Sequence, residues 1–100
     1  DGQTIASASA DSTIKLWSIA GQELKTLKGH TSFVNSVSFS PDGNTIASGG
    51  ADNTVRLWSV AGQELQVFNG HAAAINSVRF SPDGQTIASA SADSTIKLWS

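Results

Sequence analysis

The chain has 100 residues, of which 39% are hydrophobic, and six basic against eight acidic side chains give a net charge of −2. The charges are scattered and no apolar run approaches the ~20 residues of a membrane span, so neither nucleic acid nor a membrane is an expected partner. The chain contains no cysteine, which excludes disulfides and Cys-ligated zinc and fits a reducing compartment; we expect the cytoplasm.

The first predicted strand of the middle region covers residues 34–40. The run alternates, with Asn35, Val37 and Phe39 expected on one side of the strand and mostly small residues between them. The Ser-Pro-Asp-Gly run at residues 40–43 predicts a turn, because proline presets φ and glycine adopts positive φ without strain.

Three more strands and two turns follow. Residues 45–48 form a short run of small and apolar residues that suits burial on both faces, and residues 49–53 predict a turn. Residues 54–58 are rich in β-branched and aromatic residues, and a second turn at residues 61–63 leads into a strand at residues 64–68. No segment has a sustained 3.6-residue period, so the sequence predicts an all-β fold.

The sequence repeats itself with a period of 41 residues. Residues 1–41 align without gaps to residues 42–82 with 25 matches, and residues 83–100 are identical to residues 1–18 throughout. A period of this length is typical of a four-stranded propeller blade. Because drift normally blurs repeats, identical ends indicate recent amplification or an engineered sequence.

These motifs and spacings resemble the WD40 repeat over the whole chain. The residues that carry the resemblance are Gly29, His30, residues 34–43, Ala47, Ser48, Asp52, Leu57 and Trp58. One departure is that Trp17, Trp58 and Trp99 are each followed by Ser, where the family's name-giving Asp would stand.

The resemblance implies a β-propeller of four-stranded antiparallel blades, with strands a to d running outward from the central channel, and about 2.5 blades in this chain. Residues 1–28 would form a partial blade (b-c-d), residues 29–69 a complete blade (a-b-c-d) and residues 70–100 a partial blade (a-b-c). Propeller blades bury both sheet faces against their neighbours. A complete ring is therefore expected only by head-to-tail association of copies or within a longer array.

The resemblance also implies a buried hydrogen-bonded tetrad in each blade. The sets are His30, Ser48, Asp52, Trp58 and His71, Ser89, Asp93, Trp99, with Ser7, Asp11 and Trp17 as a partial set. Ser, His and Asp also make up a hydrolytic triad, but a triad needs an oxyanion hole and an accessible nucleophile. A set that recurs in every blade favours a structural role. We therefore expect no catalytic residue and no enzyme, and no cofactor. Since the two histidines fall on adjacent blades, we also expect no metal site.

Partners of WD40 proteins usually meet the face formed by the d–a and b–c loops. By resemblance this candidate protein-binding face contains Phe33, Asn35, Ala51, Ala74, Asn76 and Ala92, with Ala10 from the partial repeat. Phe33 is the only large apolar residue among them, and it either anchors a partner or packs against a neighbouring loop. The asparagines are expected to bond loop backbone groups.

The charged residues Lys15, Arg56 and Lys97 are expected at solvated strand positions. We therefore predict a non-enzymatic scaffold or protein-interaction platform that associates with copies of itself, with other proteins as further candidate partners. The alternative is an engineered or recently amplified repeat without an evolved ligand.

Overall fold

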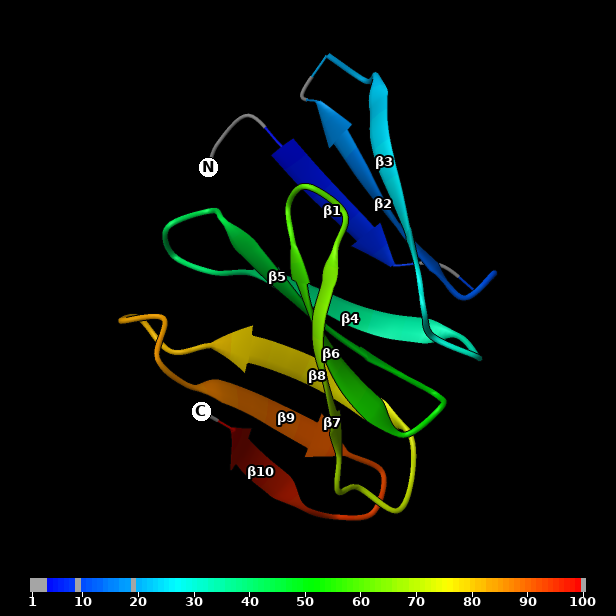
Figure 1. Ribbon diagram of the computed structural model, residues 1–100. Coiled ribbons are helices and arrows are strands. Elements are labelled where there is room, and N and C mark those ends of the chain that lie inside the picture. The colour runs from blue at the N-terminus through cyan, green and yellow to red at the C-terminus, as the bar shows by residue number, and fades with distance from the viewer. Residues whose placement is uncertain (1–3, 9, 19, 100) are drawn as a thin grey trace.

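The computed structural model describes residues 4–8, 10–18 and 20–99, and this part of the chain contains ten strands and no helix (Figure 1). No helix that could cross a membrane is therefore found among the described residues. The strands are β1 (Thr4–Ala8), β2 (Thr13–Ser18), β3 (Glu23–Lys28), β4 (Val34–Phe39), β5 (Thr45–Gly50), β6 (Thr54–Ser59), β7 (Glu64–Asn69), β8 (Ile75–Phe80), β9 (Ile87–Ser91) and β10 (Ile96–Trp99).

The strands form three antiparallel sheets. The first sheet has the order β1-β2-β3, the middle sheet β4-β5-β6-β7, and the third sheet β8-β9-β10. The middle sheet lies between the other two, and the sheets follow one another in chain order (Figure 1). The all-β prediction and the estimate of about two and a half blades are confirmed, and the sheets do not close into a ring.

The predicted Ser-Pro-Asp-Gly turn joins β4 to β5. Gly43 has a φ of 75°, the left-handed conformation that glycine adopts without strain. The Ser40 hydroxyl donates to the Asp42 carboxylate at 2.6 Å, and it accepts a hydrogen bond from the backbone N–H of Thr45 at 3.0 Å. The same turn recurs between β8 and β9, where Gly84 has a φ of 73°.

The predicted alternation along β4 is wrong at its start. The pairing of β4 with β5 shifts register between Val34 and Ser36. A bulge of this kind inserts one residue and changes the face that the following side chains occupy. Val34 therefore shares a core with Val37 and Phe39. Asn35, which the alternation placed beside Val37, instead reaches the third sheet.

The predicted turn at residues 49–53 begins too early, because β5 continues through Gly49 and Gly50. Gly49 pairs with Val55, and a Cβ on Gly49 would overlap the Ile75 side chain of β8. Because glycine has no side chain, Gly49 allows the middle and third sheets to pack closely at this position.

Two apolar cores lie between the sheets. The first core consists of Ile14, Leu16 and Leu27 from the first sheet and Val34, Ile46 and Trp58 from the middle sheet. The second core consists of Ala47 and Val55 from the middle sheet and Ile75, Val78 and Ile87 from the third. Each sheet thus has a leading face toward the next sheet along the chain and a trailing face toward the previous one.

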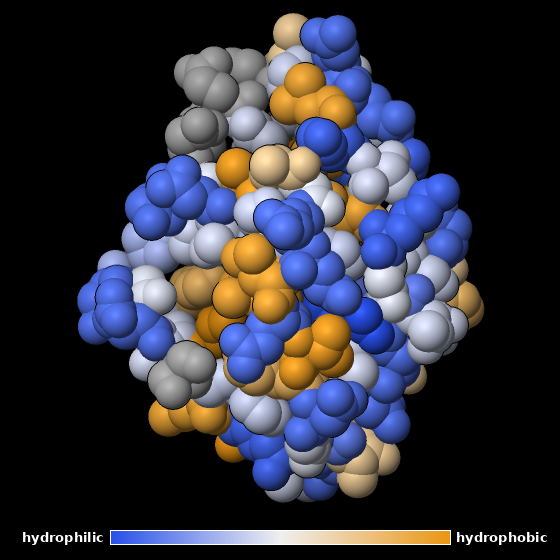
Figure 2. Space-filling model, in the orientation of Figure 1, coloured by the Kyte–Doolittle hydropathy of each residue, from blue (hydrophilic) through white to orange (hydrophobic). Residues whose placement is uncertain are grey.

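The leading face of the third sheet and the trailing face of the first sheet are open. Ile96 and Leu98 on β10 are 74% and 72% exposed, whereas Ile14 and Leu16 at the same repeat positions are 0% and 2% exposed. Ile5 on β1 is 53% exposed, against 0% for its counterpart Ile46. On the side that Figure 2 shows, apolar residues reach the surface in separate patches among hydrophilic ones.

The prediction that Arg56 is a solvated strand residue is wrong. The Arg56 side chain is only 13% exposed, and its guanidinium lies 2.6 Å from Glu64 on β7 and 3.7 Å from Asp52. Lys15 makes the corresponding ion pair with Glu23 on β3 at 2.8 Å. The Glu that begins each outer strand therefore faces a cation on the adjacent strand.

Candidate functional site

A buried chain of hydrogen bonds joins the loop before β4 to strands β5 and β6. Trp58 Nε1 donates to Ser48 Oγ at 2.8 Å, and Ser48 Oγ lies 2.7 Å from His30 Nε2. His30 Nδ1 lies 3.0 Å from Asp52 Oδ2. Every proton has an acceptor when Trp58 donates to Ser48, Ser48 to His30 and His30 to Asp52.

The same arrangement recurs in the third sheet. Trp99 Nε1 donates to Ser89 Oγ at 2.9 Å, and Ser89 Oγ lies 2.8 Å from His71 Nε2. His71 Nδ1 lies 3.1 Å from Asp93 Oδ2. The structure thus brings together both sets of four residues that the family resemblance implied.

The first sheet contains part of the same arrangement. Trp17 Nε1 donates to Ser7 Oγ at 3.0 Å. Asp11 accepts hydrogen bonds from the backbone N–H and the hydroxyl of Thr13, at 3.0 and 2.5 Å. In all three sheets the Ser and the Trp lie on neighbouring, paired strands, which are β1 and β2, β5 and β6, and β9 and β10.

A threonine that the sequence analysis did not single out belongs to each network. The Thr54 hydroxyl donates to Asp52 at 2.7 Å and lies 3.4 Å from His30 Nδ1. Thr95 makes the corresponding contacts with Asp93 and with His71, the latter at 3.1 Å. A signal was present, because threonine recurs two residues after each turn aspartate, where its N–H and hydroxyl bond the carboxylate.

The carboxylates of Asp52 and Asp93 bond the backbone of the loops at one end of the sheets. Asp52 accepts a hydrogen bond from the backbone N–H of Thr31 at 3.0 Å, and Asp93 accepts one from Ala72 at 3.0 Å. Asp52, its turn and the loop before β4 are therefore held together even where the side chains of that loop are exposed.

Glycine precedes each histidine for a steric reason. A Cβ on Gly29 would lie 2.7 Å from Cη2 of Trp58, and a Cβ on Gly70 would lie 2.7 Å from Cη2 of Trp99. Real Cβ atoms do not approach carbon so closely, so the Gly-His pair allows the indole ring to close over the network.

Burial and hydrogen bonding set the charge states of the network. Burial lowers the pKa of His30 below its usual value, although the neighbouring Asp52 carboxylate acts in the opposite sense. Burial alone would raise the pKa of Asp52, but hydrogen bonds from Thr54 and Thr31 outweigh it and leave the pKa below its usual value. The hydrogen bonds from Thr95 and Ala72 hold the pKa of Asp93 far below its usual range. The middle sheet therefore favours a neutral His30 beside an ionised Asp52.

The network keeps its polar atoms away from solvent. Ser48 is 0% and His30 6% exposed. Among the described residues, every buried side-chain nitrogen and oxygen has a hydrogen-bond partner, and no group of three or more His, Asp or Glu side chains is placed to hold a metal ion. A satisfied polar network of this kind stabilises one arrangement of the loops and strands around it.

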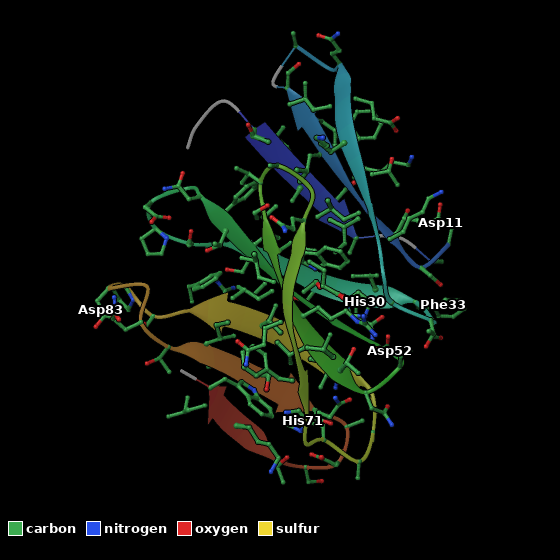
Figure 3. The ribbon with its side chains drawn as sticks, in the orientation of Figure 1. Asp11, His30, Phe33, Asp52, His71 and Asp83 are labelled. Carbon is green, nitrogen blue, oxygen red and sulfur yellow. The ribbon has the colours of Figure 1, made fainter. Side chains whose placement is uncertain are left out.

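The residues of the candidate protein-binding face lie around the same loops. Phe33 is 56% exposed, at the same end of the sheets as Asp11, His30 and Asp52 (Figure 3). The backbone N–H of Ala51 donates to the Phe33 carbonyl at 2.7 Å. Phe33 therefore presents its ring to solvent while its backbone is fixed.

The other positions of this face differ from one another in their surroundings. The Ala92 N–H donates to the Ala74 carbonyl at 2.9 Å, which repeats the Ala51–Phe33 pairing. Asn76 is exposed. Asn35 does not bond a loop as expected: its amide donates to the Ile75 carbonyl of β8 at 2.9 Å and joins the middle sheet to the third.

Comparison with known proteins places the chain in a family. The model of the WD40 family (WD domain, G-beta repeat) matches residues 1–18, 21–59 and 62–100, so the chain belongs to the WD40 repeat family. Proteins of this family are in general interaction modules without enzymatic activity, and their repeats mediate contacts between proteins.

Individual relatives match over single repeats. The nuclear distribution protein PAC1 of Mycosarcoma maydis is 52% identical over 42 residues, which are 41% of this chain and 9% of that protein. PAC1-2 of Postia placenta is 42% identical over 41 residues, 40% of this chain and 10% of the relative. PAC1 of Tuber melanosporum is 49% identical over 37 residues, 37% of this chain and 8% of the relative. This chain therefore spans about a tenth of the length of the curated relatives it matches.

Proposed function

We propose that this chain is a non-enzymatic WD40 scaffold that associates with copies of itself and presents its loop face to other proteins, in the cytoplasm. The observation that supports self-association is the pair of open sheet faces. Leu98 is 72% exposed, whereas Leu16 at the same repeat position is 2% exposed because the middle sheet covers it. A second copy would give the open faces the neighbour that the inner faces already have.

The proposed blades are residues 1–28, 29–69 and 70–100, and the buried His networks have a structural role within them. Asp52 accepts a hydrogen bond from a backbone N–H of the loop before β4, and Asp93 accepts one from the loop before β8, the inner strand of its own sheet. These bonds hold the loop face in one shape, which lowers the ordering cost of binding a partner there.

Self-association is tested by replacing Ile5 with Glu. Ile5 is 53% exposed, so the charge leaves a single folded copy intact but places a carboxylate in any apolar contact with a second copy. We expect sedimentation equilibrium to show oligomers for the unmodified chain and a single copy for Ile5→Glu. The control is Leu65→Glu on the outer strand β7, where Leu65 is 48% exposed. A folded single copy of the unmodified chain at high concentration would refute the proposal.

The loop face is tested through Phe33, the large apolar residue that projects there. We expect Phe33→Ser to lose a saturable protein partner in an affinity capture read by mass spectrometry, because exposed aromatics commonly anchor interfaces. Leu24→Ser is the control, since Leu24 is also about half-exposed (48%) but lies on β3. Equal capture by both variants would remove Phe33 from the proposed surface.

A second candidate, an engineered or recently amplified repeat without an evolved ligand, is favoured by the identity of residues 1–18 and 83–100. It predicts that no saturable partner is captured while self-association persists.

A further inference from the structure

Two identical segments of the chain occupy different structural settings. Residues 1–18 and 83–100 have the same sequence, yet β1 and β2 pair with the outer strand β3, whereas β9 and β10 pair with the inner strand β8. Among the described residues, β1 has no inner neighbour and β10 has no outer neighbour. Each three-stranded sheet therefore contains the strand that the other one lacks.

We propose that β8 of one copy leaves its own β9 and pairs with β1 of a second copy, so that a complete four-stranded sheet β8-β1-β2-β3 forms from two chains. This inference rests on the proposed self-association and specifies how it occurs. The duplicated residues 83–100 of the first copy are then released from the sheet.

The register of the exchanged pair follows from the sequence identity. In one copy, Val78 pairs with Ser89, Arg79 with Ala88 and Phe80 with Ile87. Ser7, Ala6 and Ile5 stand at the same places in β1, and β1 pairs with β2 in the same order as β9 with β10. Every side-chain neighbour that β8 loses on β9 is replaced by the same residue type on β1.

Exchange also unites the parts of one buried network. His71 bonds Ser89, which accepts from Trp99 Nε1 at 2.9 Å. In the first sheet Ser7 accepts from Trp17 Nε1 at 3.0 Å in the same way. When β8 pairs with β1, the histidine of one copy meets the serine and tryptophan of the other, so both copies contribute residues to a single network.

Exchange covers the open trailing face of the first sheet and removes the exposed leading face of β10 from the stack. Ile5, 53% exposed in one copy, takes the place of Ile87, which is 5% exposed against the middle sheet. The ring of Phe68, whose centroid lies 5.0 Å from that of Trp99, meets Trp17 instead. The exposed leading face of β10 leaves the sheet, and the leading face of the new sheet is that of β2, which the second copy's middle sheet already buries.

The exchange sets a stoichiometry. Each copy keeps residues 1–82 in the assembly, which are two repeat periods of 41 residues, so every copy adds two blades. Because propellers close with roughly 4 to 8 blades, the assembly mass is expected at about two to four times the 10.3 kDa of one chain.

Disulfide trapping in the full chain tests the pairing, since the natural sequence has no cysteine. Arg79→Cys combined with Ala6→Cys places the thiols opposite each other only if β8 pairs with β1 of another copy. In a single copy, β1 and β8 lie on opposite sides of the middle sheet (Figure 1). Arg79→Cys combined with Ala88→Cys is the matched control, because these residues face each other only in the unexchanged sheet.

We expect mild oxidation to link most of the Ala6 variant into chains of two or more copies on a non-reducing gel, and to leave the Ala88 variant largely without an internal disulfide. The reverse pattern would overturn the exchange. Sedimentation of the unmodified chain distinguishes failure of the exchange from failure of self-association. Oligomers together with the reverse disulfide pattern refute only the exchange. A single copy in solution refutes self-association as well.

Discussion

The Asp52 carboxylate accepts hydrogen bonds from the Thr31 N–H, the Thr54 N–H and the Thr54 hydroxyl, and it lies beside His30. Its side chain is 6% exposed. Removal of such an acceptor leaves several buried donors unpaired, and an unpaired buried donor costs more than a hydrogen bond contributes when it is made. The loop before β4 and the turn after β5 therefore depend on this one residue.

We expect Asp52→Ala to lower the free energy of unfolding by about 1–3 kcal/mol, because His30 and the Thr31 N–H lose their acceptor. Urea unfolding followed by tryptophan fluorescence measures the change. Asp42→Ala is the control, since Asp42 is an exposed turn residue, and its effect should be smaller. An unchanged midpoint for Asp52→Ala would contradict the role assigned to the network.

The same residues predict acid sensitivity. His30, Asp52 and Asp93 all have lowered pKa values in the fold, so the unfolded chain binds more protons than the folded one at acid pH. The His30 contribution is complete above the unfolded pKa of about 6.5 and is lost as the pH falls below it; the aspartate contributions are lost below about 4. We expect urea midpoints that are constant from about pH 7 to 8 and fall progressively in acid. A midpoint that rises on acidification would contradict this assignment.

The burial of a single strand in this protein depends on the sheet that packs beside it. β2 and β10 contain the same Ile-Lys-Leu-Trp sequence, yet β2 packs on the middle sheet and β10 has a bare leading face. The hydrophobic effect depends on the area removed from water, which the neighbouring sheet determines.

This contrast predicts different costs for one substitution at two equivalent positions. Leu16→Ala should destabilise by about 2–5 kcal/mol, because Leu16 is 2% exposed and its truncation leaves a cavity. In the Ile5→Glu background, which is expected to remain a single copy, Leu98→Ala should change the unfolding free energy by at most about 0.5 kcal/mol, because Leu98 is 72% exposed in one copy. Thermal or urea unfolding of both variants provides the measurement. Equal losses at the two positions would show that the leading face of β10 is covered.

The three sheets together form an open stack, and its two exposed sheet faces carry the same kinds of side chain as the faces buried inside it. The first core uses the leading face of the first sheet and the trailing face of the middle sheet, and the two end faces are of the same two kinds. Such a stack is complementary to itself, which is the condition for head-to-tail association.

Stability should therefore depend on protein concentration. If assembly stabilises the folded chain, mass action raises the melting temperature as the concentration increases. We expect differential scanning fluorimetry over a hundredfold concentration range to show a rising melting temperature for the unmodified chain and a constant one for Ile5→Glu. A constant value for both would indicate that the end sheets are stable without a second copy.

Much of the fold follows from local patterns. The repeat, the alternating runs and the Ser-Pro-Asp-Gly turns predicted the strands to within one or two residues, because these signals depend on backbone conformation and on short-range periodicity. The family motif indicated which His, Ser, Asp and Trp lie together. The threonines beside Asp52 and Asp93 were missed, although their spacing from each aspartate is visible in the sequence.

Other features depend on contacts between residues far apart in the chain. The bulge in β4 turns Asn35 toward the Ile75 carbonyl, 40 residues away, and Arg56 is buried by partners on the adjacent strand and turn. The described residues of the identical segments 1–18 and 83–100 differ in burial for the same reason. Local sequence determines where a strand forms and which way its side chains alternate, whereas burial is a property of the neighbouring sheet, which a local pattern does not specify.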